Sequence, residues 1–280
     1  MAAPSDRRAY HAPCTRPPMN QAVISWAAFA GHFRTVGIGI GPALISGFAM
    51  TKTIQLYIDH KSPYAYLAIE PAWELERDFD VQLDWLPYTL DIPDYLGSAE
   101  VGEDGSVIAE NRTAHQWRRV RYSYMDARRY ANLRGLTIRG PQKIWDSSLS
   151  GIGLLWAKTQ GCVRKYNDIV YERFWQRALD IEDARVIESV LREAGADTAG
   201  FTKWAQGDGR SLHDRVRADA EAAGVFGVPT FVLDGELFWG REHLALIRLR
   251  LLELGLVRPG VSSALDVSHA RRDRDGVNDS

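Results

Sequence analysis

The chain has 280 residues, of which 45% are apolar, 25% charged and 10% aromatic. These values are typical of globular proteins and exclude collagen-like and wholly disordered chains. The 34 basic and 36 acidic residues give a net charge of −2, so the chain lacks the positive charge typical of nucleic-acid binding. Cys14 and Cys162 belong to no Cys-x-x-Cys pair, and a disulfide framework, a zinc site and a dithiol centre therefore all lack support. This cysteine usage favours a reducing compartment, the cytoplasm.

The two ends of the chain differ from its middle. We expect residues 1–49 to be a flexible extension, or translation to start at Met50, because this segment has no regular apolar period. Its apolar stretch, 35–49, contains four glycines and a proline and is shorter than the ~20 residues that cross a membrane. We therefore predict no membrane anchor. Residues 259–280 are polar and predict a solvated tail.

The body begins with a β-α-β pattern. Residues 53–59 are rich in β-branched and aromatic side chains and predict a strand. Ser62 and Pro63 then predict the start of a helix, because Ser is a favoured N-cap and Pro is favoured at the first helical position. Residues 81–86 alternate between apolar and polar and predict a second strand, parallel to the first.

The middle and the end of the body complete the predicted α/β fold. Residues 91–110 predict a loop, and apolar spacing predicts helices over 114–133, 148–159, 164–179 and 181–193. A further helix over 212–223, a hairpin over 225–239 with an Asp234-Gly235 turn, and a helix over 242–254 follow. This order predicts a thioredoxin-like domain made of 50–90 and 211–258, with an inserted all-helical domain at 91–210.

Ser62 is the first candidate site residue. A hydroxyl at a helix N-terminus, directly after a strand, lies where backbone N–H groups and the helix dipole favour an anion such as a thiolate. A plain helix cap accounts for the same residue, and taken alone it is the more frequent explanation.

Val228-Pro229 is the second candidate. Proline is rare inside a strand because it cannot donate to the ladder, but it is common at a strand start or in a cis bond. A cis bond would leave the backbone of Val228 free to pair with an extended ligand. An ordinary loop proline is the alternative.

Taken together, the Ser62-Pro63-Tyr64-Ala65 helix start, the helical insertion and Val228-Pro229-Thr230-Phe231 resemble one family over about Lys52 to Leu254. This family is the DsbA-like thioredoxin fold in its glutathione-using branch, the 2-hydroxychromene-2-carboxylate isomerases and kappa-class glutathione transferases. Redox members carry Cys-Pro-x-Cys at the helix start. Here neither cysteine is present, which excludes dithiol exchange at this position.

The resemblance implies glutathione as the cofactor, with Ser62 holding its sulfur as a thiolate that adds reversibly to a conjugated carbonyl substrate. It also implies that Val228 and Pro229 pair with the glutathione backbone and that Asn111 contacts glutathione. Arg241 and Glu242 match a family segment that holds the γ-glutamyl group, with Glu242 in place of the family's Asp. No metal ligand set is implied.

Three functions stay open from the sequence. The first is an isomerase of the 2-hydroxychromene-2-carboxylate type, acting on an aromatic-ring breakdown product. The second is a kappa-like glutathione transferase, and the third is a non-catalytic thiol- or peptide-binding protein. The small substrate is expected to be aromatic and anionic. One or two of the seven arginines of the inserted lobe, between Arg118 and Arg139, would suit an anion, although a solvated helix face is the more frequent explanation for most of them. Nucleic acid is not expected as a partner, and a homodimer stays open as the assembly.

Overall fold

A computed structural model describes residues 51–102, 104 and 106–261. The predicted extension at 1–49 and most of the predicted tail, 262–280, lie outside the described residues. Within the described ranges, no helix combines the length and the hydrophobicity that crossing a membrane requires.

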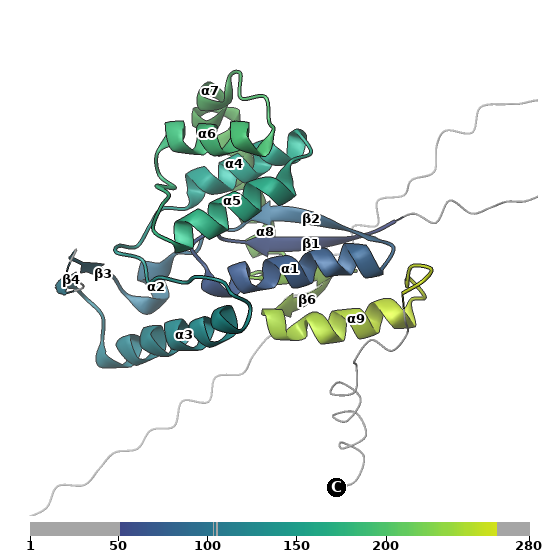
Figure 1. Cartoon of the computed structure of the whole chain (residues 1–280), viewed down its shortest axis with the longest axis horizontal. Helices are drawn as coiled ribbons and strands as arrows, with labels where there is room; N and C mark the ends of the chain where they lie inside the picture. Colours follow the sequence, from purple (N-terminus) through teal and green to yellow (C-terminus); the bar gives the residue numbers. More distant parts are fainter. Residues whose placement is uncertain (1–50, 103, 105, 262–280) are drawn as a thin grey trace, which may run out of the picture. The chain divides into compact units, whose positions relative to one another are not determined.

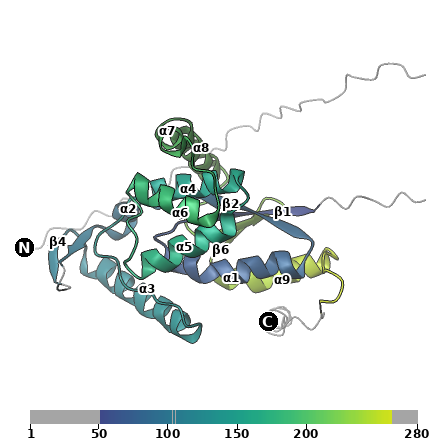
Figure 2. The same ribbon diagram turned by 45° about the horizontal axis from the view of Figure 1, so that its top comes forward.

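The sheet confirms the predicted α/β fold. It has the order β2-β1-β5-β6, in which β1 and β2 are parallel and the other neighbours antiparallel. Its strands are β1 (Lys52–Ile58), β2 (Val81–Pro87), β5 (Thr230–Leu233) and β6 (Glu236–Trp239). Helices α1 (Pro63–Asp78) and α9 (Leu244–Glu253) run side by side (Figures 1 and 2). A single 3₁₀ turn, η1 (Arg241–His243), leads into α9.

Local sequence explains where these elements begin and turn. Ser62 is the N-cap of α1 and Pro63 is its first residue, as predicted. Asp234 and Gly235 both have positive φ, 55° and 82°, which is the conformation of a two-residue hairpin turn and suits an Asp-Gly pair. The turn therefore sets the register in which β5 meets β6.

The insertion is mainly helical. It contains α3 (Ala114–Leu133), α4 (Ser148–Thr159), α5 (Val163–Trp175), α6 (Ala184–Ala194) and α7 (Phe201–Gln206), and α8 (Asp208–Ala222) crosses the boundary predicted between 210 and 211. Helix α4 packs against β2, and Figure 1 shows α4–α7 gathered on that side of the sheet. The segment predicted as a loop, 91–110, instead holds a short helix and a hairpin, α2 (Ile92–Leu96), β3 (Ala99–Val101) and β4 (Val107–Glu110). The insertion is thus not all-helical.

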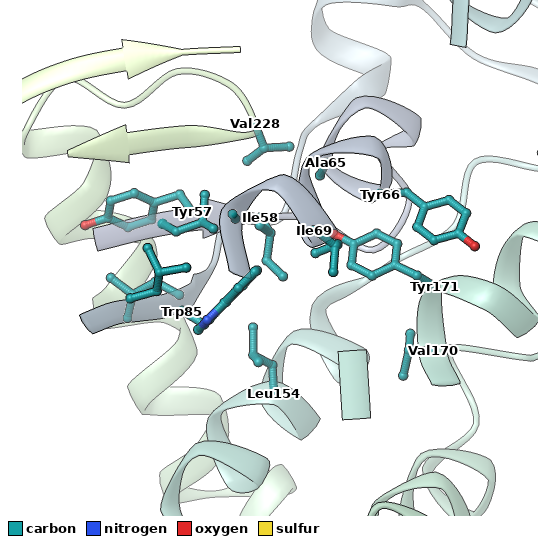
Figure 3. Packing of buried hydrophobic residues seen from close by; sticks show 14 of the residues in the cluster. Tyr57, Ile58, Ala65, Tyr66, Ile69, Trp85, Leu154, Val170, Tyr171 and Val228 are labelled. Carbon is teal, nitrogen blue, oxygen red and sulfur yellow. The ribbon is translucent and has the colours of Figure 1, made fainter. Parts of the chain in front are cut away.

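The core is continuous from the sheet into the lobe. Trp175, Tyr166 and Tyr171 are among the largest fully buried side chains and belong to the same cluster as the strand residues. Tyr171 of α5 stacks on Tyr66 of α1, with ring centroids 5.3 Å apart and an interplanar angle of 3°, and Figure 3 shows this pair between the two helices. Burial of these rings holds the lobe to the start of α1.

Gly153 of α4 marks the tightest packing in the lobe. A Cβ there would overlap the hydroxyl of Tyr166 and lie 2.9 Å from Cγ2 of Ile187. We expect Gly153→Ala to lower the free energy of unfolding by about 2 kcal/mol, because overpacking outweighs the gain in helix propensity. Urea denaturation measures the change. Gly140→Ala is the control, since a Cβ there would meet only the flexible end of Arg128, at 3.4 Å; equal effects of the two would contradict the prediction.

Candidate functional site

The turn between β1 and α1 carries the first site residue. Ser62 is 5% exposed, and its Oγ accepts a hydrogen bond from the N–H of Ala65 at 3.2 Å. Among the described residues, the hydroxyl proton of Ser62 has no acceptor and the N–H of Tyr64 has no partner. Two donors at a helix N-terminus are therefore available to an anion.

The buried carboxylate of Asp59 holds this turn through hydrogen bonds to the backbone. It accepts hydrogen bonds from the N–H of Lys61 at 3.0 Å and of Leu90 at 2.8 Å. The Nζ of Lys61 lies 3.6 Å from Oδ2 of Asp59, and the Lys61 side chain is 8% exposed. The ammonium compensates the buried carboxylate, which would otherwise oppose an anion at Ser62. Lys61 was not singled out from the sequence, although it lies directly before Ser62.

His60 connects the turn to the helical lobe. The ring is 2% exposed, with Nδ1 3.0 Å from Oγ of Ser150 on α4 and Nε2 3.2 Å from Oδ1 of Asn167 on α5. Burial lowers the pKa of His60 to about 4, although the bond to Asn167 and the charge of Asp59 act to raise it. The imidazole is therefore neutral near pH 7. Because both ring nitrogens already have partners, His60 positions the turn rather than carrying a proton.

Val228 and Pro229 lie at the same end of the sheet as this turn. Tyr57 pairs with Thr230, so the residues just before Thr230 lie beside the end of β1. The Val228–Pro229 bond is cis, and the carbonyl of Pro229 accepts the N–H of Gly240 at 2.8 Å. The N–H and C=O of Val228 have no partner within the described part of the chain. They are thus available to a ligand with an extended backbone.

Arg241 and Glu242 follow directly from Gly240. The guanidinium of Arg241 lies 3.6 Å from the ring centroid of Tyr130 on α3, so this residue joins α9 to α3. The Glu242 carboxylate lies where a Cβ on Gly240 would be, and Gly240 has a φ of +101°. Only glycine combines that conformation with that close approach. Glu242 is exposed. It lies two residues after Gly240, whose N–H donates to the carbonyl of Pro229.

Asn111 and Arg112 lie at the foot of the hairpin. Asn111 exchanges hydrogen bonds with the backbone of Ser98, accepting through Oδ1 at 2.6 Å and donating through its N–H at 3.0 Å. Arg112, which the sequence analysis missed, donates its Nε to the carbonyls of Leu96 and Gly97 at 3.0 and 3.3 Å. Its Nη atoms have no partner within 51–261 as described. A fixed guanidinium with free ends is suited to a carboxylate.

Three tyrosines with raised pKa values lie on α1, α2 and α3. The hydroxyl of Tyr64 lies 3.2 Å from Oδ2 of Asp126 on α3, and burial, followed by the charge of Asp126, raises the pKa of Tyr64 to about 12. Burial raises the pKa of Tyr124 to about 12, while Arg112 acts to lower it. The pKa of Tyr95 is raised by burial and then by the charge of Asp59. All three phenols are therefore protonated near pH 7, and the proton of Tyr64 is donated to Asp126.

Metal-ligating side chains and cysteine are two further kinds of group that can carry chemistry. The described residues contain no group of three or more His, Cys, Asp and Glu placed to hold a metal ion. Cys162 lies at the start of α5, half-buried, with a pKa raised by burial. The Ser62 turn itself contains no cysteine.

Comparisons with known proteins agree with this fold. A sequence model of the DsbA-like thioredoxin domain matches residues 53–251. The 2-hydroxychromene-2-carboxylate isomerase of Sphingobium xenophagum is 25% identical over 205 residues, which cover 73% of this chain and all of the relative. A solved structure of 2-hydroxychromene-2-carboxylate isomerase has a TM-score of 0.57 at 19% identity and covers 80% of this chain and 98% of that one. The cytosolic disulfide reductase DsbM of Pseudomonas aeruginosa, solved with GSH, has a TM-score of 0.52 at 15% identity. The match covers 72% of this chain and 97% of that one.

Proposed function

Since this chain belongs to the DsbA-like thioredoxin domain family, we propose that it is a glutathione-dependent isomerase. Its substrate would be a conjugated carbonyl compound of the kind that the name 2-hydroxychromene-2-carboxylate isomerase describes for its relatives. The observation that carries the proposal is the pair of free donors at the start of α1, the Ser62 hydroxyl and the Tyr64 N–H. Cysteine is absent from this position, so the pair suits a thiolate from outside the chain.

The residues at this end of the sheet fit a glutathione molecule. Ser62 and Tyr64 would hold the sulfur at the helix N-terminus, where the dipole favours the anion. The unpaired backbone of Val228 would receive the peptide part of the ligand. The exposed carboxylate of Glu242, joined to Pro229 through Gly240, would receive the ammonium of the γ-glutamyl group. When bound, glutathione would supply a nucleophilic thiolate that adds reversibly to the substrate.

The remaining residues would orient the substrate. Arg112 is fixed through its Nε and offers its Nη atoms to a carboxylate. Tyr95 and Tyr124 stay protonated, because burial raises the pKa of each phenol, so they would donate to a carbonyl oxygen rather than repel it. This arrangement supports the aromatic, anionic substrate class expected from the sequence.

Calorimetric titration of the full chain with reduced glutathione and with S-methylglutathione tests the proposal. We expect reduced glutathione to bind at least about tenfold more tightly, because methylation removes the charge-assisted hydrogen bonds of the sulfur. An absorbance assay with 2-hydroxychromene-2-carboxylate in the presence of glutathione then follows the reaction. Failure of both ligands to bind would refute the glutathione dependence.

The same assays distinguish the alternatives. Accumulation of a glutathione conjugate with a hydrophobic electrophile, without isomer formation, would identify a kappa-like transferase. Tight binding of reduced glutathione with no turnover of either substrate would identify a thiol-binding protein. Isomer formation with glutathione regenerated supports the isomerase.

A further inference from the structure

A hollow of about 380 Å³ lies in the helical lobe. It is bounded by the segment before α4, which supplies Arg139 and Trp145, and by the end of α5 with the following loop, which supplies Phe174, Arg177 and Asp180. This volume falls within the roughly 300–1,000 Å³ range of small-molecule sites. It shares no lining residue with the Ser62 turn, Val228-Pro229 or the foot of the hairpin.

Two guanidiniums face this hollow without a counter-ion. Arg177 donates its Nε to the carbonyl of Gly140 at 2.7 Å, and Arg139 donates Nη1 to the carbonyl of Gln176 at 3.4 Å. Neither forms an ion pair with any residue in the described ranges. The one acidic lining residue, Asp180, accepts the N–H of Glu182 at 2.8 Å. The lining thus carries a net charge of about +1 and fixed, unused N–H donors, which suit a carboxylate.

Aromatic rings form another part of the lining. Trp145 and Phe174 meet edge to face, with centroids 5.9 Å apart and an angle of 79°. The Nζ of Lys143 lies 4.3 Å from the centroid of Trp145, and it pairs with Glu182 at 2.5 Å, so the charge that faces the hollow comes from the two arginines. Rings of this kind favour a planar, apolar partner.

The backbone of Arg177 is strained. Its φ is +61°, and it follows the end of α5, a place where glycine is the usual residue because L side chains are disfavoured in the left-handed region. The structure keeps a long charged side chain there and directs it to the carbonyl of Gly140. A residue held in an unfavourable conformation, with its charge on a cavity wall, indicates a role for the side chain.

We propose that this hollow is a second small-molecule site and that it binds a planar aromatic carboxylate. Arg139 and Arg177 hold the carboxylate, and Phe174 with Trp145 packs against the ring. The proposal does not depend on glutathione binding, so either can fail while the other stands.

Calorimetric titration of the full chain with salicylate, and with the neutral salicylamide, tests this site. We expect salicylate to bind at least about tenfold more tightly, because only the charged group forms charge-assisted bonds to the two arginines. Equal affinity for the two compounds, or no binding of salicylate, would overturn the proposal.

Variants locate the binding. The double variant Arg139→Gln, Arg177→Gly should lose about tenfold or more in salicylate affinity, and glycine suits the backbone conformation at 177. The control Arg185→Gln, Arg215→Gln makes the same charge change at two exposed arginines outside the hollow and should bind as the unmodified chain does. Equal loss in both would show a non-specific charge effect and refute the site. Ala178→Trp, an exposed lining position, should block binding without removing a charge, and unchanged binding there would also refute it.

Discussion

Replacing Ser62 with alanine is expected to raise the pKa of the bound glutathione thiol by about one to two units and to slow isomerisation about 100-fold. The hydroxyl of Ser62 has no acceptor among the described residues, so it can donate its hydrogen bond to the sulfur. Hydrogen bonds to a charged group contribute about 1.5–3 kcal/mol, and one pKa unit corresponds to about 1.4 kcal/mol. Losing a donor to a developing anion slows enzymes about 10²–10³-fold.

Ultraviolet titration of bound glutathione measures the thiol pKa, and the absorbance assay measures the rate. Ser62→Ala also removes the N-cap bond to Ala65, which costs about 1 kcal/mol of stability. Asp183→Ala is the matched control, because Asp183 caps α6 by accepting the N–H of Arg185 at 2.7 Å. It should lose similar stability with no change in the thiol titration. Identical thiol pKa values in Ser62→Ala and the unmodified chain would disprove the assigned role of Ser62.

Local sequence signals were sufficient for the framework of this site. The Ser62-Pro63 helix start, the parallel β1-α1-β2 unit and the Asp234-Gly235 turn all depend on neighbouring residues, and all were predicted. The predicted limits of the helix over 114–133 match those of α3. This boundary also depends on neighbouring residues, because a capping box at Thr113 defines the helix start. Hairpin β3–β4 was missed because its glycines and acids have no alternation that indicates a strand.

Contacts between distant segments could not be predicted. The guanidinium of Arg241 lies over Tyr130, 111 positions earlier in the chain, a contact that the sequence did not indicate; whether Arg241 also contacts glutathione stays a prediction. Asn111 was expected to contact glutathione, and its side chain amide bonds the backbone of Ser98; whether it also contacts glutathione stays a prediction. Arg112, the next residue, is fixed by the carbonyls of the α2–β3 loop, whose structure the sequence did not indicate. Such side-chain positions depend on how the insertion folds over α1.

The buried ring of His60 makes the stability of the fold sensitive to acid. The pKa of His60 is about 4 in the folded protein, against 6.5 for a free histidine. Between these values the unfolded chain binds a proton that the folded chain does not, so stability is fully present above about pH 6.5 and falls as the pH drops towards 4. A difference of this size corresponds to about 3 kcal/mol. Protonation of His60 would also loosen the turn that carries Ser62, because the ring bonds to Ser150 and Asn167 hold this turn against the lobe.

Urea denaturation between pH 7 and pH 4 tests this coupling. The unmodified chain should lose about 3 kcal/mol more than His60→Gln over that range, because glutamine keeps hydrogen-bonding capacity but takes up no proton. Burial also lowers the pKa of His213, and its contribution cancels because both proteins retain it. His115→Gln, an exposed position on α3, should follow the unmodified chain. Parallel curves for His60→Gln and the unmodified chain would show that His60 is not the acid-sensitive group, and the turn would then have to be held by Asp59 and its bonds to Lys61 and Leu90.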